Sequence, residues 1–281
     1  MEHINIIERE LKMKVSILLC VYNSDVSLLS EVIKSIDNQT YKEYEVLIIN
    51  DGTTDINTIK YLDELRGKQG YTVYDNKQNL GLIDSLNLGI DMCNGEYIAR
   101  FDDDDISSEI RLERQVQFLD ENKNISVLGA HAEIVNSDLL RTTTKKFPSS
   151  KDIKKYLPYR CPVSHSLVMF RRKDVINAGK YESIYKGCED YALWLNMISK
   201  GYELDNLQEV LGKTKFTVED ANKRSKNIRK NLFKAKLKYL PKSKLYGIKG
   251  IIFSMIWSMI PQIFINKIYS KDINSAILLN R

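Results

Sequence analysis

Four consecutive carboxylates, Asp102 to Asp105, follow an apolar stretch at residues 97–101 that has the length of a β-strand. Adjacent negative charges repel one another, and they are costly to bury unless a positive group neutralises them. The cluster is therefore either a solvated acidic turn or a site where carboxylate oxygens hold a divalent cation together with ligand phosphates. A calcium EF-hand is disfavoured, because no glycine occupies the sixth loop position counted from Asp102, Asp103 or Asp104.

A second pair of carboxylates, Glu189 and Asp190, opens an apolar stretch that is expected to be helical to about Lys200 and to stop at Gly201. Negative side chains stabilise the first turn of a helix through the helix dipole, which would explain the pair without any catalytic role. The alternative is a general base presented at the start of a helix. These residues alone leave both interpretations open.

The first hundred residues alternate between expected strands and expected helices. Residues 15–21 form a near-continuous apolar run, which is typical of a strand buried on both faces of a parallel sheet. Ser27 and Asp55 are the expected N-caps of the first two helices, and Gly95 is the expected left-handed residue after the third. This alternation predicts a parallel sheet built from βαβ units. The further strands are expected at residues 45–50, 71–74 and 97–101, and the helices at 27–38, 55–65 and 81–92.

Polar residues follow three of these strands. They are Tyr22 and Asn23 after the first strand, Asp51 after the second, and the acidic cluster after the fourth. Ligands of open α/β sheets bind beyond the carboxyl ends of the strands, so these side chains are expected to converge on one site. Asp51 by itself could be a turn residue that caps a helix, but three polar strand ends in succession weaken that interpretation.

The second half of the chain is less regular. A helix is expected at 109–122, strands at 126–135 and 166–170, and a short helix at 174–178 before a glycine. His165 directly precedes the second of these strands. It is either a third metal ligand, an acceptor contact or, as we favour, a polar histidine with a structural role.

Taken together, these residues resemble the family 2 glycosyltransferases of the GT-A fold, which use nucleotide sugars to make bacterial surface polysaccharides. The resemblance covers roughly residues 14–215, and its elements occur in the order that the family has. They are Val-Ser-Ile-Leu-Leu-Cys-Val-Tyr-Asn at 15–23, Ile-Ile-Asn-Asp-Gly at 48–52, Asn-Leu-Gly-Leu at 79–82, Leu-Asn-Leu-Gly-Ile at 86–90, Gly-Glu-Tyr-Ile-Ala-Arg-Phe-Asp-Asp-Asp-Asp at 95–105, Met-Phe-Arg-Arg at 169–172 and Glu-Asp-Tyr-x-Leu-Trp at 189–194.

The resemblance implies an α/β fold with a Rossmann-like, mostly parallel sheet flanked by helices. It implies a metal-dependent hexosyltransferase that moves sugar from a nucleotide diphosphate-sugar, in our interpretation a UDP-sugar, to a glycan or lipid-linked acceptor. Mn²⁺ or Mg²⁺ would be held by Asp104 and Asp102, and Asp190 with its neighbour Glu189 would supply the base. The implied contacts to the nucleotide sugar are Val21, Tyr22, Asn23, Asp51, Asn79, Gly81, Arg100, Asp102 and Asp103.

A base on the face opposite the leaving diphosphate implies a single displacement, with inversion of the anomeric centre. Two departures from the family pattern affect the site. Asp103 occupies the middle of the acidic motif, where a small residue is common, so the motif does not identify which carboxylates bind the metal. Leu86 replaces an arginine often found before Asn87, so a donor contact from that arginine is missing.

The pattern divides the chain into three predicted segments. Residues 1–105 form a nucleotide-sugar-binding half, and 106–217 form the acceptor-binding and base-carrying half of the same domain. Residues 218–281 form a basic amphipathic helical tail. Within this tail, residues 221–281 contain 14 Lys and Arg and one acid, a net charge of +13, whereas the remaining chain has 28 basic and 36 acidic residues. Such asymmetry predicts a polyanionic partner for the tail.

The tail also contains an apolar run at residues 251–265, which Pro261 interrupts and which is shorter than the ~20 residues that span a bilayer. Because lysines flank the run on both sides, it is expected to lie as an interfacial helix on an anionic membrane surface. The alternative is a helix packed on the catalytic body or against a second copy in a homodimer. Nucleic acid is not an expected partner, because no recognised nucleic-acid-binding fold accompanies the charge.

Composition favours a cytoplasmic protein that is peripheral on the inner face of the cell membrane. The first residues lack the basic start and apolar run of a secretory signal. The four cysteines are widely spaced and form no Cys-x-x-Cys, so reduced thiols are expected.

Two other functions are alternatives to sugar transfer. A sugar-1-phosphate nucleotidyltransferase has a similar nucleotide-binding sheet. The first loop of that class is typically Gly-rich and contains Arg and Lys, whereas the first loop here begins Tyr22-Asn23-Ser24-Asp25. A non-catalytic nucleotide-sugar-binding module would not need the carboxylate of Asp190.

Overall fold

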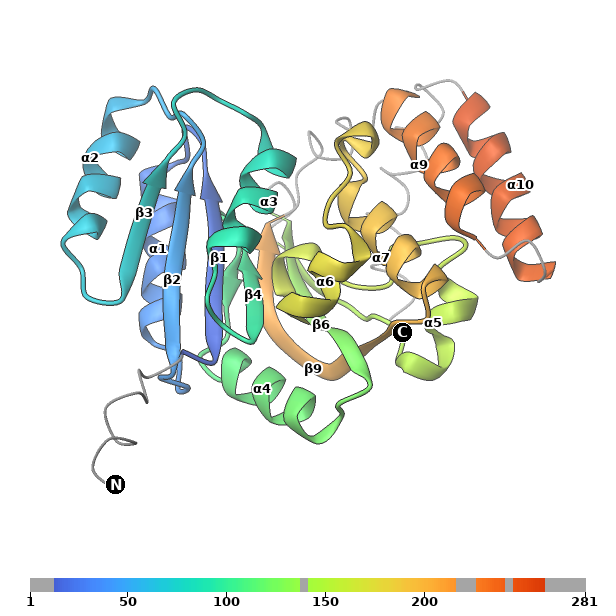
Figure 1. Ribbon diagram of the computed structural model, residues 1–281, viewed down its shortest axis with the longest axis horizontal. Helices are drawn as coiled ribbons and strands as arrows, with labels where there is room; N and C mark the ends of the chain where they lie inside the picture. The colour runs from blue at the N-terminus through green and yellow to red at the C-terminus, as the bar shows by residue number, and fades with distance from the viewer. Residues whose placement is uncertain (1–12, 137–140, 216–225, 241–244, 261–281) are drawn as a thin grey trace, which may run out of the picture.

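A sheet of nine strands crosses the part of the chain that the computed structural model describes, residues 13–136, 141–215, 226–240 and 245–260 (Figure 1). In spatial order the strands are β3 (Tyr71–Asp75), β2 (Tyr44–Asn50), β1 (Val15–Val21), β4 (Tyr97–Phe101), β8 (Met169–Arg171), β6 (Ile125–Asn136), β9 (Glu203–Lys215) and β5 (Ile106–Ser107), while β7 (Arg141–Lys145) pairs with β6.

The first four strands are parallel to their neighbours, as the sequence predicts. The register pairs Val21 with Asn50 and Leu19 with Phe101, so β1, β2 and β4 end along the same edge of the sheet. Beyond β4 the sheet becomes mixed, because β8 runs antiparallel to both β4 and β6, whereas β9 runs parallel to β6.

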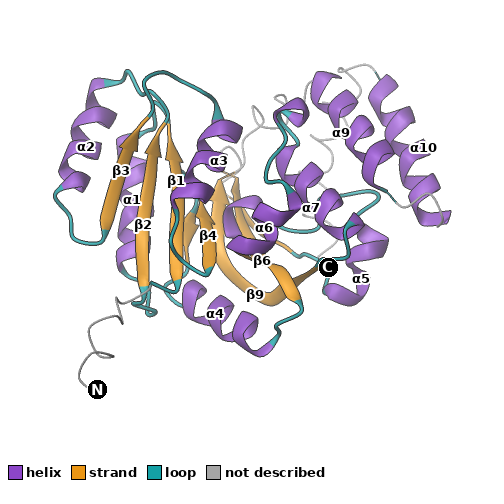
Figure 2. Ribbon diagram, viewed as in Figure 1, coloured by secondary structure: helices purple, strands orange, loops and turns teal. Residues whose placement is uncertain are grey.

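Helices cover both faces of the sheet (Figure 2). One face packs against α1, α2 and α4, and the other packs against α3, α6 and α7. Two short 3₁₀ turns, η1 (His165–Leu167) and η2 (Ser183–Tyr185), lie in the connections of the second half. The helices are α1 (Val26–Asp37), α2 (Ile56–Arg66), α3 (Leu82–Met92), α4 (Arg111–Glu121), α5 (Ser150–Tyr156), α6 (Arg172–Ala178), α7 (Glu189–Ser199), α9 (Lys226–Tyr239) and α10 (Leu245–Met259).

The near-continuous apolar run of β1 is explained by this two-sided cover. Ile17 and Leu19 belong to the core beneath α1 and α4, whereas Leu18 points to the opposite core beneath α3. Because successive strand side chains point to opposite faces, a strand covered on both faces needs apolar residues at every position.

Three local predictions are wrong in detail. Asp25, not Ser27, caps α1, because its carboxylate accepts the Ser27 and Leu28 amides and the helix already begins at Val26. Gly95 is not left-handed; a Cβ atom at this position would lie 2.5 Å from the Ser16 nitrogen, so close packing on β1 requires the glycine. The strand expected at 166–170 begins only at Met169, after η1.

The sequence analysis missed β5, β7, β9 and α5. The longest of these, β9, is polar over much of its length, and its residues alternate irregularly around three register shifts against β6. Backbone pairing with β6 stabilises a strand of this kind, and its sequence has no regular apolar alternation. Hydrophobic periodicity therefore did not predict it.

The C-terminal helices pack on the rest of the protein. Ala235 of α9 and Leu240, which directly follows this helix, are buried in one apolar cluster with Tyr191 and Leu195 of α7. α10 packs on α9, at the right edge of Figure 1, and its Phe253 ring lies edge-on to Tyr159, with centroids 5.7 Å apart. No helix in the described ranges is long and apolar enough to cross a bilayer, and residues 261–265 of the predicted apolar run lie outside those ranges.

Lys236 is buried where α7, α9 and α10 meet. Its Nζ donates a hydrogen bond to Ser254 Oγ at 2.8 Å and lies 5.1 Å from the centre of the Tyr191 ring. Burial lowers the pKa of Lys236 from 10.5 to about 8, and the nearby thiols of Cys161 and Cys188 only partly oppose that shift. Between these two pKa values the unfolded chain binds more protons than the folded chain, so this lysine makes stability rise with pH from 8 to 10.5.

We therefore expect Lys236→Met to stabilise the protein at pH 7 by about 1–3 kcal/mol, because it removes a buried charge while keeping the volume of the side chain. The variant should also gain less stability than wild type between pH 8 and 10.5. The measurement is chemical unfolding at several pH values, with the exposed Lys234→Met on the same helix as the control. Equal pH dependence of the two variants would contradict this account.

Candidate functional site

The carboxyl edge of the parallel strands brings the predicted polar strand ends together. Tyr22 follows β1, Asp51 follows β2 and Asp102 follows β4, in strands whose register places their ends side by side. Tyr22 is 48% exposed, so its ring is accessible at this edge. The geometry therefore agrees with a single site beyond the strand ends, although contact of each residue with a ligand remains a prediction.

Asp51 is buried and accepts several hydrogen bonds from the protein itself. Its carboxylate accepts the amides of Leu80 and Gly81 at 2.8 and 2.9 Å, and it also accepts Asn76 Nδ2 and Ser85 Oγ. Asp51 thus orders the loop that carries Asn79 and Gly81 and the start of α3. Its predicted contact with the base or ribose stays a prediction, and the loop is its observed partner.

Gly52 allows that loop to pass close to the end of β2. Its φ of +72° is left-handed, and a Cβ atom there would lie 2.4 Å from the carbonyl carbon of Gln78. Asn23 stabilises the neighbouring turn, because its Oδ1 accepts the amides of Thr54 and Asp55 at 2.8 and 2.9 Å. The side chain of Asn23 is therefore engaged in shaping the site.

Three of the four clustered aspartates come together. Asp102, Asp104 and Asp105 each have a carboxylate oxygen within 4.8 Å of the others, an arrangement in which hard oxygen ligands can hold Mg²⁺ or Mn²⁺. Asp103 turns away and accepts a short hydrogen bond from Ser24. This grouping includes Asp105, a member of the predicted acidic cluster to which the resemblance did not assign the metal.

Asp105 is held by β9, the strand that periodicity missed. Thr214 Oγ1 donates to its carboxylate at 2.9 Å, and the side chain is 5% exposed. Burial, together with the charge of Asp102, raises the pKa of the Asp105 carboxyl well above its ordinary value. A divalent cation beside these carboxylates would favour their ionised form, so the donor set fits a metal ion.

Arg100 lies beneath the acidic cluster and neutralises part of its charge. This side chain is 3% exposed, and its guanidinium pairs with Asp102 through both terminal nitrogens. Its Nε is buried without a hydrogen-bond partner within the described part of the chain. In the described geometry Arg100 orients Asp102, and its predicted contact with the nucleotide sugar stays a prediction.

His165 lies beside Arg100 and Tyr181, outside the group of three aspartates. Its Nε2 is 2.8 Å from the Tyr181 hydroxyl, at hydrogen-bonding distance. Burial and the charge of Arg100 hold the pKa of His165 well below its ordinary value, so the ring is neutral at pH 7. The observed partner of His165 is therefore a tyrosine, and a metal contact stays a prediction.

Glu189 and Asp190 form the first turn of α7, as predicted. Glu189 Oε2 accepts the amide of Gly187 at 2.6 Å, and Cys161 Sγ is 3.5 Å from Asp190 Oδ2. Burial and the charge of Asp190 raise the pKa of Glu189. One oxygen of Glu189 is thus committed to the loop before the helix, whereas among the described residues the hydrogen-bond contact of the Asp190 side chain is the weak one from the Cys161 thiol.

Tyr181 connects the two halves of the site, and the sequence analysis missed it. Burial raises the pKa of its hydroxyl, on which the charges of Arg100, Asp190 and Glu189 also act. Asn87 of α3 fixes its backbone, because the Asn87 side chain both donates to the Tyr181 carbonyl and accepts its amide. Asn87 of the motif Leu86-Asn87 therefore has a structural function here. A single asparagine within a predicted helix gave no indication of that function in the sequence.

A scan of known protein families matches residues 16–179 to the model described as Glycosyl transferase family 2. Similar sequences include the UDP-Gal:alpha-D-GlcNAc-diphosphoundecaprenol beta-1,3-galactosyltransferase of Escherichia coli, 34% identical over 215 residues that cover 75% of this chain and 77% of that protein. The amylovoran biosynthesis glycosyltransferase AmsE of Erwinia amylovora is 30% identical over 211 residues, which cover 74% of this chain and 79% of that one.

Two solved structures are similar in fold. TarS residues 1–349 of S. aureus, in complex with UDP, matches with a TM-score of 0.64 and 18% identity over 86% of this chain and 71% of that chain. The mannosyltransferase PcManGT from Pyrobaculum calidifontis, in complex with GDP-Man and Mn²⁺, matches with a TM-score of 0.64 and 14% identity over 94% of this chain and 75% of that chain. These likenesses confirm the fold class predicted from the sequence.

Proposed function

The chain belongs to glycosyl transferase family 2, and on this premise we propose that it moves a sugar from a UDP-sugar to a hydroxyl group of a glycan or lipid-linked acceptor. The transfer inverts the anomeric centre and contributes to the synthesis of a cell-surface polysaccharide. Support for the donor and acceptor comes from the E. coli relative, whose name includes UDP-Gal and a diphosphoundecaprenol-linked sugar.

One observation supports the proposal: Arg100, which pairs with Asp102 of the trio, lies near enough to Glu189 and Tyr181 for its charge to act on both side chains. Nucleotide binding alone would not require the carboxylate of Asp190, although a carboxylate there also suits the first turn of α7. A Mn²⁺ or Mg²⁺ ion held by the trio would neutralise the negative charge that develops on the leaving diphosphate.

The protein side chains then have separate tasks. Arg100 holds Asp102 in place by a two-nitrogen ion pair. Asp51 keeps the loop of Asn79 and Gly81 against the strand ends, where the nucleotide is expected.

Asp190 is the proposed general base. A hydroxyl oxygen attacks the anomeric carbon only as it loses its proton, and a carboxylate within hydrogen-bonding reach can accept that proton. The carboxylate of Asp190 is better placed for this task than that of Glu189, because one Glu189 oxygen already accepts the Gly187 amide. Attack from the side opposite the diphosphate gives inversion in one displacement.

The test is to incubate the protein with a panel of nucleotide sugars, Mn²⁺ and candidate acceptors, and to identify the released nucleotide. Release of nucleoside diphosphate together with a glycosylated product supports sugar transfer. Release of pyrophosphate would instead indicate a nucleotidyltransferase, and tight donor binding without any release would indicate a binding module.

We further propose that α10 brings the enzyme to an anionic membrane surface. Ser254, on its polar side, is buried against Lys236 of α9, so the apolar side of the helix is the one that faces solvent. The exposed apolar residues of α10 recur at spacings of three and four, which places them on one stripe along the helix. The stripe comprises Ile248, Ile252, Met255, Ile256 and Met259, with Phe253 beside it.

The full-length protein should therefore co-sediment with anionic vesicles, and high salt should weaken this binding without abolishing it, because salt screens charge but not apolar insertion. The double variant Ile252→Glu/Ile256→Glu should lose the binding that persists at high salt. Ile56→Glu, at an exposed isoleucine on α2, is the matched control.

Point substitutions are preferable to truncation here, because removal of α9 would uncover Tyr185, Cys188 and Leu195. A full-length protein that stays in the supernatant with anionic vesicles at low salt would contradict membrane binding. The stripe would then be assigned to contact with a second copy of the chain.

A further inference from the structure

We infer that α9 is a positioning element of the active site: it fixes the loop before α7 and thereby aims the carboxylates of Glu189 and Asp190. The inference rests on the proposed function for the identity of the reaction, but its structural basis is independent of the donor. α9 lies outside the sequence motifs that carry the resemblance to the family, because that resemblance ends near residue 215.

The loop between α6 and α7 has little regular structure of its own. Between Ala178 and Glu189 it contains one 3₁₀ turn, η2, and left-handed residues at Gly179, Lys180 and Gly187. The amide of Gly187 donates to Glu189 Oε2 at 2.6 Å, so the conformation of the loop directly determines where this carboxylate lies. External contacts are needed to select one conformation of such a segment.

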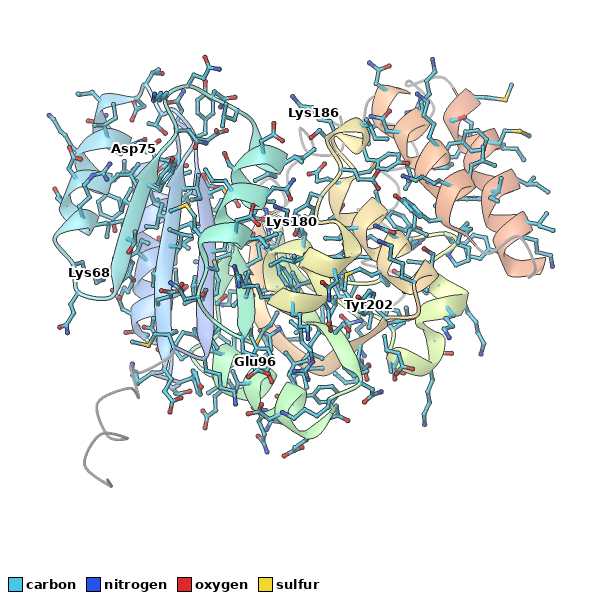
Figure 3. The ribbon with its side chains drawn as sticks, in the orientation of Figure 1. Lys68, Asp75, Glu96, Lys180, Lys186 and Tyr202 are labelled. Atoms are coloured by element: carbon cyan, nitrogen blue, oxygen red, sulfur yellow. The ribbon has the colours of Figure 1, made fainter. Side chains whose placement is uncertain are left out.

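The side of α9 that faces the loop touches it at both ends. Ile228 packs on Gly187, where a Cβ atom would lie only 2.6 Å from Ile228 Cδ1. One turn further along, Asn231 Nδ2 donates to the carbonyl oxygen of Lys186 at 3.2 Å; Lys186 is labelled in this loop in Figure 3. These contacts hold the last residues before the first turn of α7.

The other end of the loop is held by the last turn of α9. The hydroxyl of Tyr239 donates a short hydrogen bond to Glu182, and Lys238 Nζ lies 2.9 Å from the same carboxylate. The Tyr239 ring also packs edge-on against Tyr185, with centroids 6.3 Å apart. The Lys238 pair is largely exposed and contributes little by charge alone, so the tyrosine supplies the larger share of this contact.

α9 packs on the base side of the site, whereas the loop is also held from the donor side, where Asn87 of α3 bonds the backbone of Tyr181. The donor side rests on β1, β2, β4 and α3, none of which shares the apolar cluster of α9. The base side rests on α7 and the loop before it, and both contribute residues to the apolar cluster of α9. Loosening α9 should therefore lower the rate of the chemical step while leaving nucleotide binding intact.

The test uses the full-length double variant Asn231→Ala/Tyr239→Phe, which removes two hydrogen bonds to the loop but keeps the aromatic ring on Tyr185. Lys234→Met, at an exposed position on the same helix, is the control. We expect kcat with a water-soluble acceptor to fall about tenfold in the double variant, since small misplacements of a catalytic group are costly. The affinity for UDP with Mn²⁺, measured by calorimetry, should stay within about twofold of wild type.

A second measurement makes the inference independent of turnover. Hydrogen–deuterium exchange of residues 182–191 should be faster in the double variant than in the control, whereas exchange in β1 and β4 should be unchanged. Unaltered exchange of residues 182–191, or a loss of UDP affinity equal to the loss of kcat, would overturn the inference. If wild type transfers sugar from no donor, the proposed function fails, and the exchange experiment still decides the role of α9.

Discussion

Asp104→Ala should abolish sugar transfer, with a loss of 10²-fold or more, since removal of a group that stabilises transition-state charge typically costs about that much. Asp104 is the exposed member of the aspartate trio, so the substitution removes a metal ligand without opening a cavity in the core. Nucleoside diphosphate should also stop raising the melting temperature in the presence of Mn²⁺, because an ion held by the trio would have lost one of its carboxylate ligands.

The control for this experiment is Asp63→Ala, at an exposed aspartate of α2 that pairs with Arg66 of the same helix. It should keep full activity and the full Mn²⁺-dependent shift in melting temperature. The reaction of the wild-type protein should also stop in excess chelator and return when Mn²⁺ or Mg²⁺ is restored. Undiminished transfer in the chelator would rule out a metal-dependent mechanism.

Asp190→Asn should lower transfer by ~10²–10⁴-fold while donor binding survives, because the amide keeps the shape of the side chain but cannot accept a proton. Calorimetry with the nucleotide sugar would measure binding, and release of nucleoside diphosphate under saturating donor and acceptor would measure kcat. An unchanged affinity with a reduced kcat identifies a group that acts in the chemical step.

Glu189→Gln provides the comparison within the same turn of helix. The Glu189 carboxylate accepts the Gly187 amide, a task that the amide oxygen of glutamine can also perform, so this substitution should cost about tenfold or less. If Glu189→Gln were the more damaging of the two, Glu189 would be the base. If Asp190→Asn bound no donor, Asp190 would have a structural role.

Much of the structure of residues 13–105 could be predicted from the sequence because local pattern and burial agree there. The apolar run of β1 encodes a strand covered on both faces, and Asp55 encodes a helix start that the structure reproduces. Glycine at position 179 likewise ends α6 in the left-handed conformation. In each case a few neighbouring residues suffice to determine the conformation.

The identity of the clustered carboxylates needed the tertiary structure. Four adjacent aspartates look equivalent in the sequence, yet Ser24 of the first loop draws Asp103 away, and Thr214 of β9 holds Asp105 beside the others. Both partners are about 80 or more residues distant along the chain. Local propensity carries no information on contacts of that range, so the sequence left open which of the four carboxylates lie together.

For the tail, too, the sequence predicted the composition of the segment but not how its helices pack. From the amino-acid sequence, residues 221–281 are basic and residues 251–265 are apolar, which favoured either a membrane surface or a packed interface for the tail. The packing of α9 against α7, and the inward position of Ser254 that leaves the apolar stripe of α10 outside, became visible in the three-dimensional structure. A helix with one polar side can place that side toward water or toward a buried lysine, and the choice depends on Lys236, a residue of another helix that periodicity cannot reveal.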